Sequence, residues 1–361
     1  MFDYIIVGGG ISALLSAREL ALSGARIAVL EKGQFGRESS WAGGGIISPL
    51  YPWRYSEEVN VLARWSQRIY RQLAQSLLDD TDLDSEWIQS GLLMLGLNDA
   101  KQACVWAEIN NIEQHILSSS QLKGVEPALS RNIEEAGLLL PQIAQIRNPR
   151  LLSALRQNLI NLGVELLEQH EVTELLSEAG RVTGVVAAGQ KRLAKGVVIT
   201  CGAWSAQLLA AHQVNLPVYP VKGQMLLYQG PPGFLKHIVM LKNCYLIPRS
   251  DGRILCGSTV ENVGFNKEIT QEANDKLRSA AEHLIPDLRD IPLERQWAGL
   301  RPGSATGIPY IGKVPSLNGL YVNVGHYRNG IVLGPAAARL LADIILGREC
   351  IVDPSPYQLK T

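Results

Sequence analysis

The sequence lacks net charge, basic clusters and long apolar runs. Lys plus Arg and Asp plus Glu each number 34 in 361 residues. No dense Lys/Arg cluster occurs, so nucleic acid is not an expected partner. No apolar run approaches the roughly 18 residues that cross a bilayer. These absences predict no integral membrane association and no polyanionic ligand.

Cysteine is also scarce, and its positions are scattered. The five residues form no CxxC pair and have no histidine at ligand spacing, so we expect no metal site. An odd number of separated cysteines favours a reducing compartment. The opening Met1-Phe2-Asp3-Tyr4 lacks the positive n-region of a signal peptide. We therefore expect a cytoplasmic protein; its oligomeric state stays open, and a homo-oligomer is compatible with the sequence.

Length and composition indicate an ordinary folded protein of about two domains. A hydrophobic fraction of 46% and a charged fraction of 19% are typical of globular chains, and 361 residues exceed the usual size of one core. The chain opens with a strand at Tyr4–Val7, a helix at Ile11–Ser23 and a strand at Ala25–Glu31. This order predicts a complete βαβ unit.

Downstream, helix-and-strand segments alternate with strand-rich ones. A helix over Pro149–Leu162, a strand over Gly196–Thr200 and a last helix over Gly334–Leu346 continue the α/β pattern. Between them, short strand candidates separated by turn residues indicate an antiparallel sheet. We predict an α/β fold with a discontinuous nucleotide-binding domain, residues 1–85, 145–216 and 297–361, and a second, antiparallel-sheet substrate domain, residues 86–144 and 217–296.

A dinucleotide fingerprint lies between the first strand and helix. Gly8 to Ala13 read GGGISA, which matches G-x-G-x-x-A in the required context. Its glycines allow a tight turn and close approach to a pyrophosphate, and the helix N-terminus supplies N–H groups to the phosphates. Glu31 ends the second strand, where a carboxylate can bind ribose hydroxyls. NAD and FAD both use this motif, so the fingerprint alone leaves the cofactor open.

Motifs spread along the chain resemble those of glycine oxidases and their D-amino acid oxidase-like flavoprotein relatives. The similar segments are Gly8–Ala13, Val197–Trp204, Pro220–Gln224, Cys244–Arg249, Trp297–Gly303, Pro309–Gly312 and Gly325–Ile331. The resemblance implies FAD as the cofactor and a Rossmann-type FAD-binding domain. Relatives such as sarcosine oxidase tether the flavin through a cysteine that follows their RPG-like region. Arg301–Gly312 contains no cysteine, so we expect non-covalent FAD.

The resemblance also implies which residues border the cofactor. Gly43–Gly45 suits such a role, because a planar ring lies close to main chain only where side chains are absent. We expect Gly330–Gly334 to precede the last helix and to direct its dipole at the flavin. The expected FAD-binding residues are Gly8, Gly10, Ile11, Ser12, Glu31, Lys32, Ser39, Ser40, Ala42, Gly43, Gly44, Val172, Gly202, Trp204, Arg301, Arg328, Asn329, Gly330 and Ile331.

Three residues are implied in substrate binding and catalysis. By resemblance, Arg301 holds the carboxylate of a small amine or amino acid, which suits its planar fork. Tyr245 donates its hydroxyl to the same carboxylate, and Arg328 lines the cavity. Hydride transfer from the α-carbon to the flavin needs no strong protein base. We therefore interpret His326 as a structural hydrogen-bonding residue.

The chain departs from the glycine oxidase pattern at four positions. Gly45 and Val260 are smaller than the family's methionines, which predicts room for a substrate side chain. Trp41 adds bulk where the family has alanine and offsets this if it points inward. Asn243 replaces a histidine. The predicted activity is oxidative deamination with oxygen as acceptor; the alternatives are an amino acid or opine dehydrogenase that reduces a quinone or partner protein, and a flavoprotein that binds a ligand without turnover.

Overall fold

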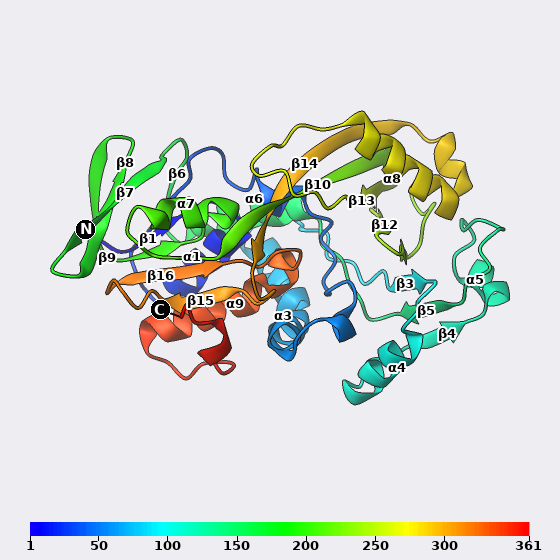
Figure 1. Cartoon of the computed structure of the whole chain (residues 1–361), viewed down its shortest axis with the longest axis horizontal. Helices are drawn as coiled ribbons and strands as arrows, with labels where there is room; N and C mark the ends of the chain where they lie inside the picture. The colour runs from blue at the N-terminus through cyan, green and yellow to red at the C-terminus, as the bar shows by residue number, and fades with distance from the viewer. Residues whose placement is uncertain (361) are drawn as a thin grey trace.

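Two large sheets dominate the computed structural model, which describes residues 1–360 (Figure 1). Both chain ends lie beside the first sheet. This sheet runs in the order β15-β16-β9-β1-β2-β6, and the neighbours from β16 to β6 are parallel. Its strands are β1 (Phe2–Val7), β2 (Ile27–Leu30), β6 (Glu165–Leu167), β7 (Val172–Glu178), β8 (Arg181–Ala187), β9 (Gln190–Ile199), β15 (Tyr310–Lys313) and β16 (Leu320–Val324).

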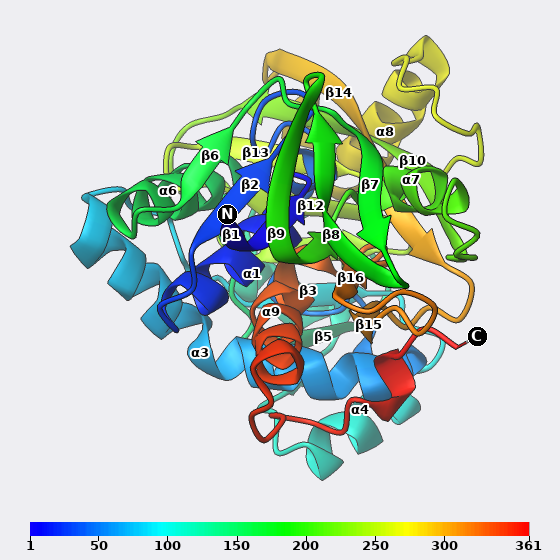
Figure 2. The same ribbon diagram turned by 90° about the vertical axis from the view of Figure 1, so that its left-hand side faces the viewer.

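The two faces of the first sheet are buried by different layers. On one face, Ile6, Val29 and Val198 share a core with four helices. On the other, Ile5, Val7 and neighbouring strand residues pack against the β7–β8 hairpin and α7; Figure 2 shows this hairpin in front of the parallel strands. Burial on both faces explains why these strands are continuous apolar runs. The helices of this part are α1 (Ile11–Ala21), α2 (Ser39–Ala42), α3 (Glu57–Thr81), α6 (Asn148–Asn161), α7 (Ser205–Ala210) and α9 (Gly330–Leu346).

The second sheet is antiparallel except for the pair β3 and β11, in the order β14-β10-β13-β12-β11-β3-β5-β4. One face packs on α8, through a core that includes Leu226, Leu246 and Leu277. Its strands are β3 (Leu92–Leu95), β4 (His115–Leu117), β5 (Gly137–Leu140), β10 (Val218–Gln229), β11 (Ile238–Leu241), β12 (Cys244–Pro248), β13 (Arg253–Gly257) and β14 (Leu293–Ser304). The helices are α4 (Ala100–Ile109), α5 (Ser119–Val125) and α8 (Gln271–Leu284).

The mixed α/β architecture with two multi-stranded sheets confirms the predicted fold class. Short 3-10 turns connect several of its elements: η1 (Pro52–Arg54), η2 (Gly202–Trp204), η3 (Pro286–Arg289) and η4 (Ser355–Tyr357). The strands β10 and β14 pair along their whole lengths, from Val218 opposite Ser304 to Tyr228 opposite Leu293. The motifs Pro220–Gln224 and Trp297–Gly303 therefore lie side by side on one continuous two-stranded ribbon.

The start of the last helix was predicted wrongly. We expected Gly330–Gly334 to precede it, but α9 begins at Gly330 and contains Pro335. Proline lacks the N–H that would bond to the Ile331 carbonyl. That carbonyl instead accepts a hydrogen bond from the Tyr70 hydroxyl at 2.6 Å. A tertiary contact from α3 thus replaces the missing helical hydrogen bond, and the helix continues through the proline.

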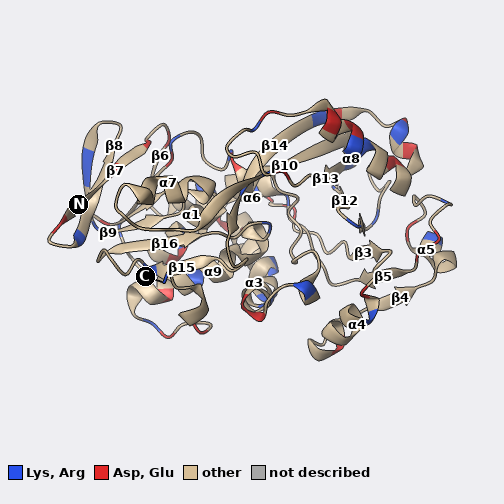
Figure 3. Cartoon of the chain, viewed as in Figure 1, with Lys and Arg blue, Asp and Glu red and all other residues tan. Residues whose placement is uncertain are grey.

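Charges of both signs are interspersed over the two parts of the molecule (Figure 3). No helix within residues 1–360 is both long enough and apolar enough to cross a membrane. The same residues contain no group of three or more His, Cys, Asp or Glu side chains placed to hold a metal ion.

Candidate active site

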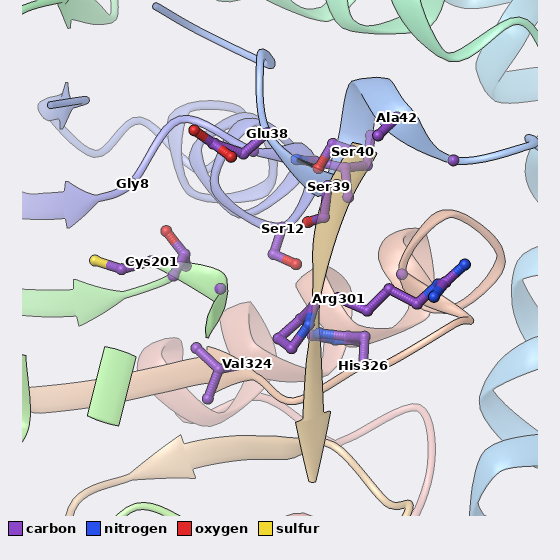
Figure 4. A pocket seen from close by; sticks show the side chains of 18 of the residues that line it. Gly8, Ser12, Glu38, Ser39, Ser40, Ala42, Cys201, Arg301, Val324 and His326 are labelled. Atoms are coloured by element: carbon purple, nitrogen blue, oxygen red, sulfur yellow. Dashed lines mark hydrogen bonds between the residues drawn. The ribbon is translucent and has the colours of Figure 1, made fainter. Parts of the chain in front are cut away.

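A cavity of about 530 Å³ is lined by residues of both sheets. Ser12, Ser39, Ser40, Arg301 and other side chains from separate elements gather around it (Figure 4). The structure brings every predicted site residue to this one cavity: Gly8, Gly10, Ile11, Ser12, Glu31, Lys32, Ser39, Ser40, Ala42, Gly43, Gly44, Val172, Gly202, Trp204, Tyr245, Arg301, Arg328, Asn329, Gly330 and Ile331.

The fingerprint loop forms a tight turn into α1. Gly8 has φ +111°, and a Cβ there would lie 2.8 Å from the Thr200 carbonyl oxygen. Only glycine fits both the dihedral and the space. The Ile11 N–H donates to Ser40 Oγ at 2.9 Å, so α2 is tied to the first turn of α1. The loop therefore brings main chain and a helix N-terminus to the cavity wall, as a pyrophosphate site requires.

Glu31 has a role that sequence reasoning missed. Its two carboxylate oxygens accept hydrogen bonds from the Gly9 N–H at 2.6 Å and the Gly33 N–H at 2.8 Å. Burial raises the pKa of this carboxyl, and the two main-chain donors oppose that rise. Glu31 thus links the fingerprint loop, through the Gly9 N–H, to the main chain at Gly33. Contact with a ribose stays a prediction, since a carboxylate oxygen can accept more than one hydrogen bond.

Lys32 and Trp204 of the cavity wall belong to an aromatic and cationic cluster that extends beyond the cavity. Lys32 Nζ lies 3.8 Å from the centre of the Trp204 ring, and Phe265 packs against the same ring with centroids 5.6 Å apart. Lys267 reaches this cluster and pairs with Glu38 at 2.8 Å. The segment between β13 and α8 is thereby held against the nucleotide-binding part.

The cavity suits FAD by the chemistry of its walls. It combines the Gly8–Gly10 turn and the α1 N-terminus with main chain free of side chains at Gly43–Gly45. A Cβ on Gly44 would lie 2.7 Å from Ile247 Cδ1 and 3.3 Å from the Tyr245 ring. The absence of a side chain at Gly44 therefore lets Ile247 and Tyr245 of β12 pack directly against its main chain.

Arg301 projects from β14 into the space left by a glycine on β10. A Cβ on Gly223 would lie 2.2 Å from the Arg301 guanidinium nitrogens. The guanidinium donates to the Lys222 and Thr259 carbonyls and to Ser258 Oγ. Burial lowers the pKa of Arg301, and the nearby Tyr245 phenol partly opposes this. No carboxylate among residues 1–360 forms an ion pair with the group, so its charge is left for a ligand anion.

Tyr245 and Arg328 complete this end of the cavity. Tyr245 lies on β12 opposite Gly257, and its hydroxyl is 3.4 Å from Met225 Sδ. Arg328 lies in the loop before α9 and has no ion-pair partner within the described chain. Two guanidinium groups and a phenol therefore meet at a site suited to an anionic ligand.

The predicted hydrogen-bonding role of His326 is not borne out at its Nε2 atom. The residue is 3% exposed, and Nε2 has no hydrogen-bond partner among residues 1–360. Burial lowers the pKa of His326 to about 4. The ring is therefore neutral at physiological pH, and no carboxylate stabilises its charged form.

His326 should make the protein sensitive to acid. Between its ordinary pKa of 6.5 and about 4, the unfolded chain binds a proton that the folded chain excludes. Stability should thus fall by roughly 3 kcal/mol as the pH drops through this window, and change no further through this group below it. Urea unfolding with excess FAD at several pH values measures this. His326→Asn should flatten the dependence, whereas His283→Asn, on an exposed face of α8, should leave it unchanged.

Val260 and Asn243, which depart from the glycine oxidase pattern, lie outside the cavity wall. Val260 is 50% exposed and does not line the cavity. Asn243 lies in the exposed turn between β11 and β12. The expectation that a small residue at 260 enlarges the pocket is therefore wrong, because the chain carries this side chain out to solvent.

The expectations for Trp41 and Gly45 also change. Trp41 packs edge-on against Trp297, with ring centroids 5.3 Å apart, and is absent from the cavity wall. It therefore does not narrow the pocket. A Cβ on Gly45 would lie 2.0 Å from the Ile146 carbonyl, so glycine is required there by the backbone (φ +75°). Gly44 likewise has no room for a side chain, because Ile247 and Tyr245 pack against it.

Several cavity residues were not predicted from the sequence. Met225 lies one residue beyond the motif Pro220–Gln224, and Thr200 and Cys201 lie within Val197–Trp204. Their closeness to these motifs could have identified them as cavity residues. Ser48 and Leu50 lie in an irregular segment after α2 that carries no recognisable motif. Only the tertiary fold brings that segment to the cavity.

Comparison with known proteins agrees with this geometry. The family model described as FAD dependent oxidoreductase (DAO) matches residues 3–344. A glycine oxidase from Pseudomonas aeruginosa is 48% identical over 98% of this chain and 97% of its own length. A glycine oxidase from Pseudomonas putida is 45% identical over 98% of this chain and 97% of its own length. The crystal structure of glycine oxidase from Geobacillus kaustophilus superposes with a TM-score of 0.95 at 31% identity, over 99% of this chain and 98% of that one.

The chain therefore belongs to the DAO family of FAD-dependent oxidoreductases. The predicted resemblance, the enzyme class and the FAD cofactor are confirmed.

Proposed function

We propose that this flavoenzyme oxidatively deaminates glycine and similarly small amino acids, with oxygen as the electron acceptor. The observation that carries the proposal is the Arg301 guanidinium, unpaired with any carboxylate among residues 1–360, in the same cavity as the nucleotide fingerprint. The glycine oxidases that are 48% and 45% identical support the choice of substrate.

In this proposal each group at the anionic end has a defined task. Arg301 binds the substrate carboxylate, and Tyr245 donates a hydrogen bond to it, so the α-carbon is held in one orientation. Arg328 adds positive charge at the same end. Bound FAD supplies the two-electron acceptor. The substrate loses two electrons and two hydrogens to become an imine, which water hydrolyses to the oxo acid and ammonia.

The remaining wall would hold the cofactor. We assign the pyrophosphate to the Gly8–Ser12 turn and Ser40, and the flavin to Gly43 and Gly44 and the N-terminus of α9 at Asn329–Ile331. The adenosine would lie between Glu31, Lys32, Val172 and the Gly202–Trp204 turn, with Ser39 and Ala42 along the ribityl chain. The helix dipoles of α1 and α9 both favour negative charge at these places.

The first sheet with its helices would form the FAD-binding domain, and the second sheet the substrate domain. We retain the predicted division into residues 1–85, 145–216 and 297–361 against 86–144 and 217–296. The junction at residue 297 falls inside β14, so the two domains would share a continuous strand. All five cysteines are free, which supports a reducing, cytoplasmic location.

FAD is expected to dissociate on denaturation. Cys201 lines the cavity, but its thiol donates to the Val7 carbonyl at 3.1 Å, and burial raises its pKa to about 12. The thiolate that would attack a flavin is therefore scarce at neutral pH. Acid precipitation should leave the yellow chromophore in the supernatant. Colour retained in the pellet after washing would show a covalent link.

The proposed reaction is tested by oxygen uptake and peroxide release with glycine, sarcosine and D-alanine. Glycine should consume oxygen and yield one peroxide per ammonia. Anaerobic bleaching of the flavin separates catalysis from passive ligand binding. Flavin reduction without peroxide, with turnover only on a dye or quinone, would identify a dehydrogenase instead. A flavin that no small amine reduces would refute the proposal.

A further inference from the structure

The Arg301 guanidinium is held by three acceptors that use one side of the group. Nη1 donates to the Lys222 carbonyl at 3.3 Å and the Thr259 carbonyl at 3.1 Å. Nη2 donates to Ser258 Oγ at 2.7 Å. A guanidinium carries five N–H donors. Within residues 1–360, Nε forms no hydrogen bond of normal geometry, and Nη2 forms one of its possible two. In a guanidinium, the Nε–H and the adjacent Nη2–H share one edge, and the two donors of such an edge match the two oxygens of a carboxylate.

Ser258 is the one side chain among the three acceptors. The two carbonyls both contact Nη1, so by themselves they leave rotation of the group about that atom unrestrained by a second hydrogen-bonding point. The bond from Nη2 to Ser258 adds a second fixed point and removes this rotation. The serine is 4% exposed, so water does not compete freely for its hydroxyl.

Ser258 itself is held rigidly. It follows Gly257, which pairs with both Tyr245 and Met225 across the sheet. On its other side, Thr259 Oγ accepts a hydrogen bond from the Gln224 N–H at 2.8 Å. The main chains of Lys222 and Glu261 then exchange two hydrogen bonds, at 2.9 and 3.0 Å. The serine hydroxyl is thus presented at a fixed point beside the guanidinium.

We propose that Ser258 is a positioning residue that sets the rotation of Arg301, so that its Nε/Nη2 edge faces the substrate carboxylate. The inference rests on the proposed function and deepens it. Ser258 makes the site selective for an anionic carboxylate over an isosteric neutral amide, because only the carboxylate accepts two hydrogen bonds from that edge. A misrotated guanidinium keeps its charge but offers one donor.

The test compares Ser258→Ala, Ser258→Thr and the parent holoenzyme. Acetate binding is followed by the change in flavin absorbance, and glycine and glycinamide by anaerobic flavin reduction. Ser258→Ala should raise the Kd of acetate and glycine about fivefold to tenfold, the effect of one charge-assisted hydrogen bond. The Kd of glycinamide should change by less than about twofold, because it presents no second anionic oxygen. Ser258→Thr, which keeps the hydroxyl, should restore both carboxylate affinities.

Ser85→Ala is the matched control. Ser85 is fully buried, its hydroxyl has no hydrogen-bond partner within residues 1–360, and it does not line the cavity. It should leave all three ligands unaffected. Equal weakening of glycine and glycinamide by Ser258→Ala would show a general structural role and overturn the inference.

A comparison with Arg301→Ala separates this inference from the proposed function. Acetate binding that is lost in Arg301→Ala but unchanged in Ser258→Ala would overturn the positioning role alone. An Arg301→Ala holoenzyme that binds acetate as tightly as the parent would overturn the carboxylate site itself, and the positioning role with it.

Discussion

Replacing Arg301 by alanine is expected to lower kcat/KM for glycine by about a hundredfold to ten-thousandfold, the effect of losing two charge-assisted hydrogen bonds. The guanidinium lies over Gly223 and has no carboxylate partner among residues 1–360. Its removal therefore leaves no cation in the same position to bind the substrate anion. Arg301→Lys should recover only part of the loss, because an ammonium group cannot form the planar two-point contact. Steady-state oxygen uptake and anaerobic flavin reduction measure both variants.

The loss in Arg301→Ala should be specific to substrates that carry a carboxylate. Glycinamide oxidation should fall far less than glycine oxidation, and FAD should still bind. Arg295→Ala is a suitable control, since Arg295 lies on the same strand, is exposed and does not line the cavity. A variant that oxidises glycine at the parental rate would contradict the role given to Arg301.

Gly8→Ala should weaken FAD binding at least tenfold and destabilise the protein by about 2–4 kcal/mol, because overpacking and an unfavourable dihedral add. The new Cβ would lie 2.8 Å from the Thr200 carbonyl oxygen, and φ at this residue is +111°. The contact is with the main chain of Thr200, directly after β9, and a backbone carbonyl cannot rotate aside as a side chain can. The turn must shift, and with it the N-terminus of α1. Fluorescence titration of the apoprotein with FAD and urea unfolding measure the two effects.

Gly24→Ala separates the cost of the dihedral from the cost of the clash. Gly24 also has a positive φ, +85°, but a Cβ there would meet nothing within 4 Å. This variant should lose about 1 kcal/mol of stability and keep its affinity for FAD. If Gly8→Ala behaved like Gly24→Ala, close packing of the fingerprint loop against Thr200 would not matter for the cofactor.

Local sequence patterns predicted much of the first sheet. The strand at Tyr4–Val7 and the helix from Ile11 were found within two residues of their observed limits, since apolar runs and a glycine turn are local signals. The last helix was placed too late because Gly334 and Pro335 read locally as a break. The helix in fact starts at Gly330, and Tyr70, far away in sequence, donates a hydrogen bond to the Ile331 carbonyl, to which Pro335 cannot donate one.

The residues of recognisable motifs line the cavity as expected, but the sequence did not predict which atoms they contact. The motif around Trp297–Gly303 pointed to Arg301, whereas the acceptors of its guanidinium come from β10 and from the segment after β13. Likewise, Glu31 was identified as a cofactor residue, yet its observed hydrogen bonds are to Gly9 and Gly33.

The amino-acid order alone was enough to establish a βαβ dinucleotide unit and the FAD-dependent family, and it predicted Arg301 as the cation that binds the substrate. These depend on short motifs whose residues are close together along the chain. The tertiary structure alone decided that close packing requires glycine at Gly44 and Gly45, that Trp41 and Val260 stay out of the pocket, and that Ser258 holds Arg301. The reason is that strand register and neighbours distant in sequence set the direction of a side chain, and a local sequence pattern predicts neither of them.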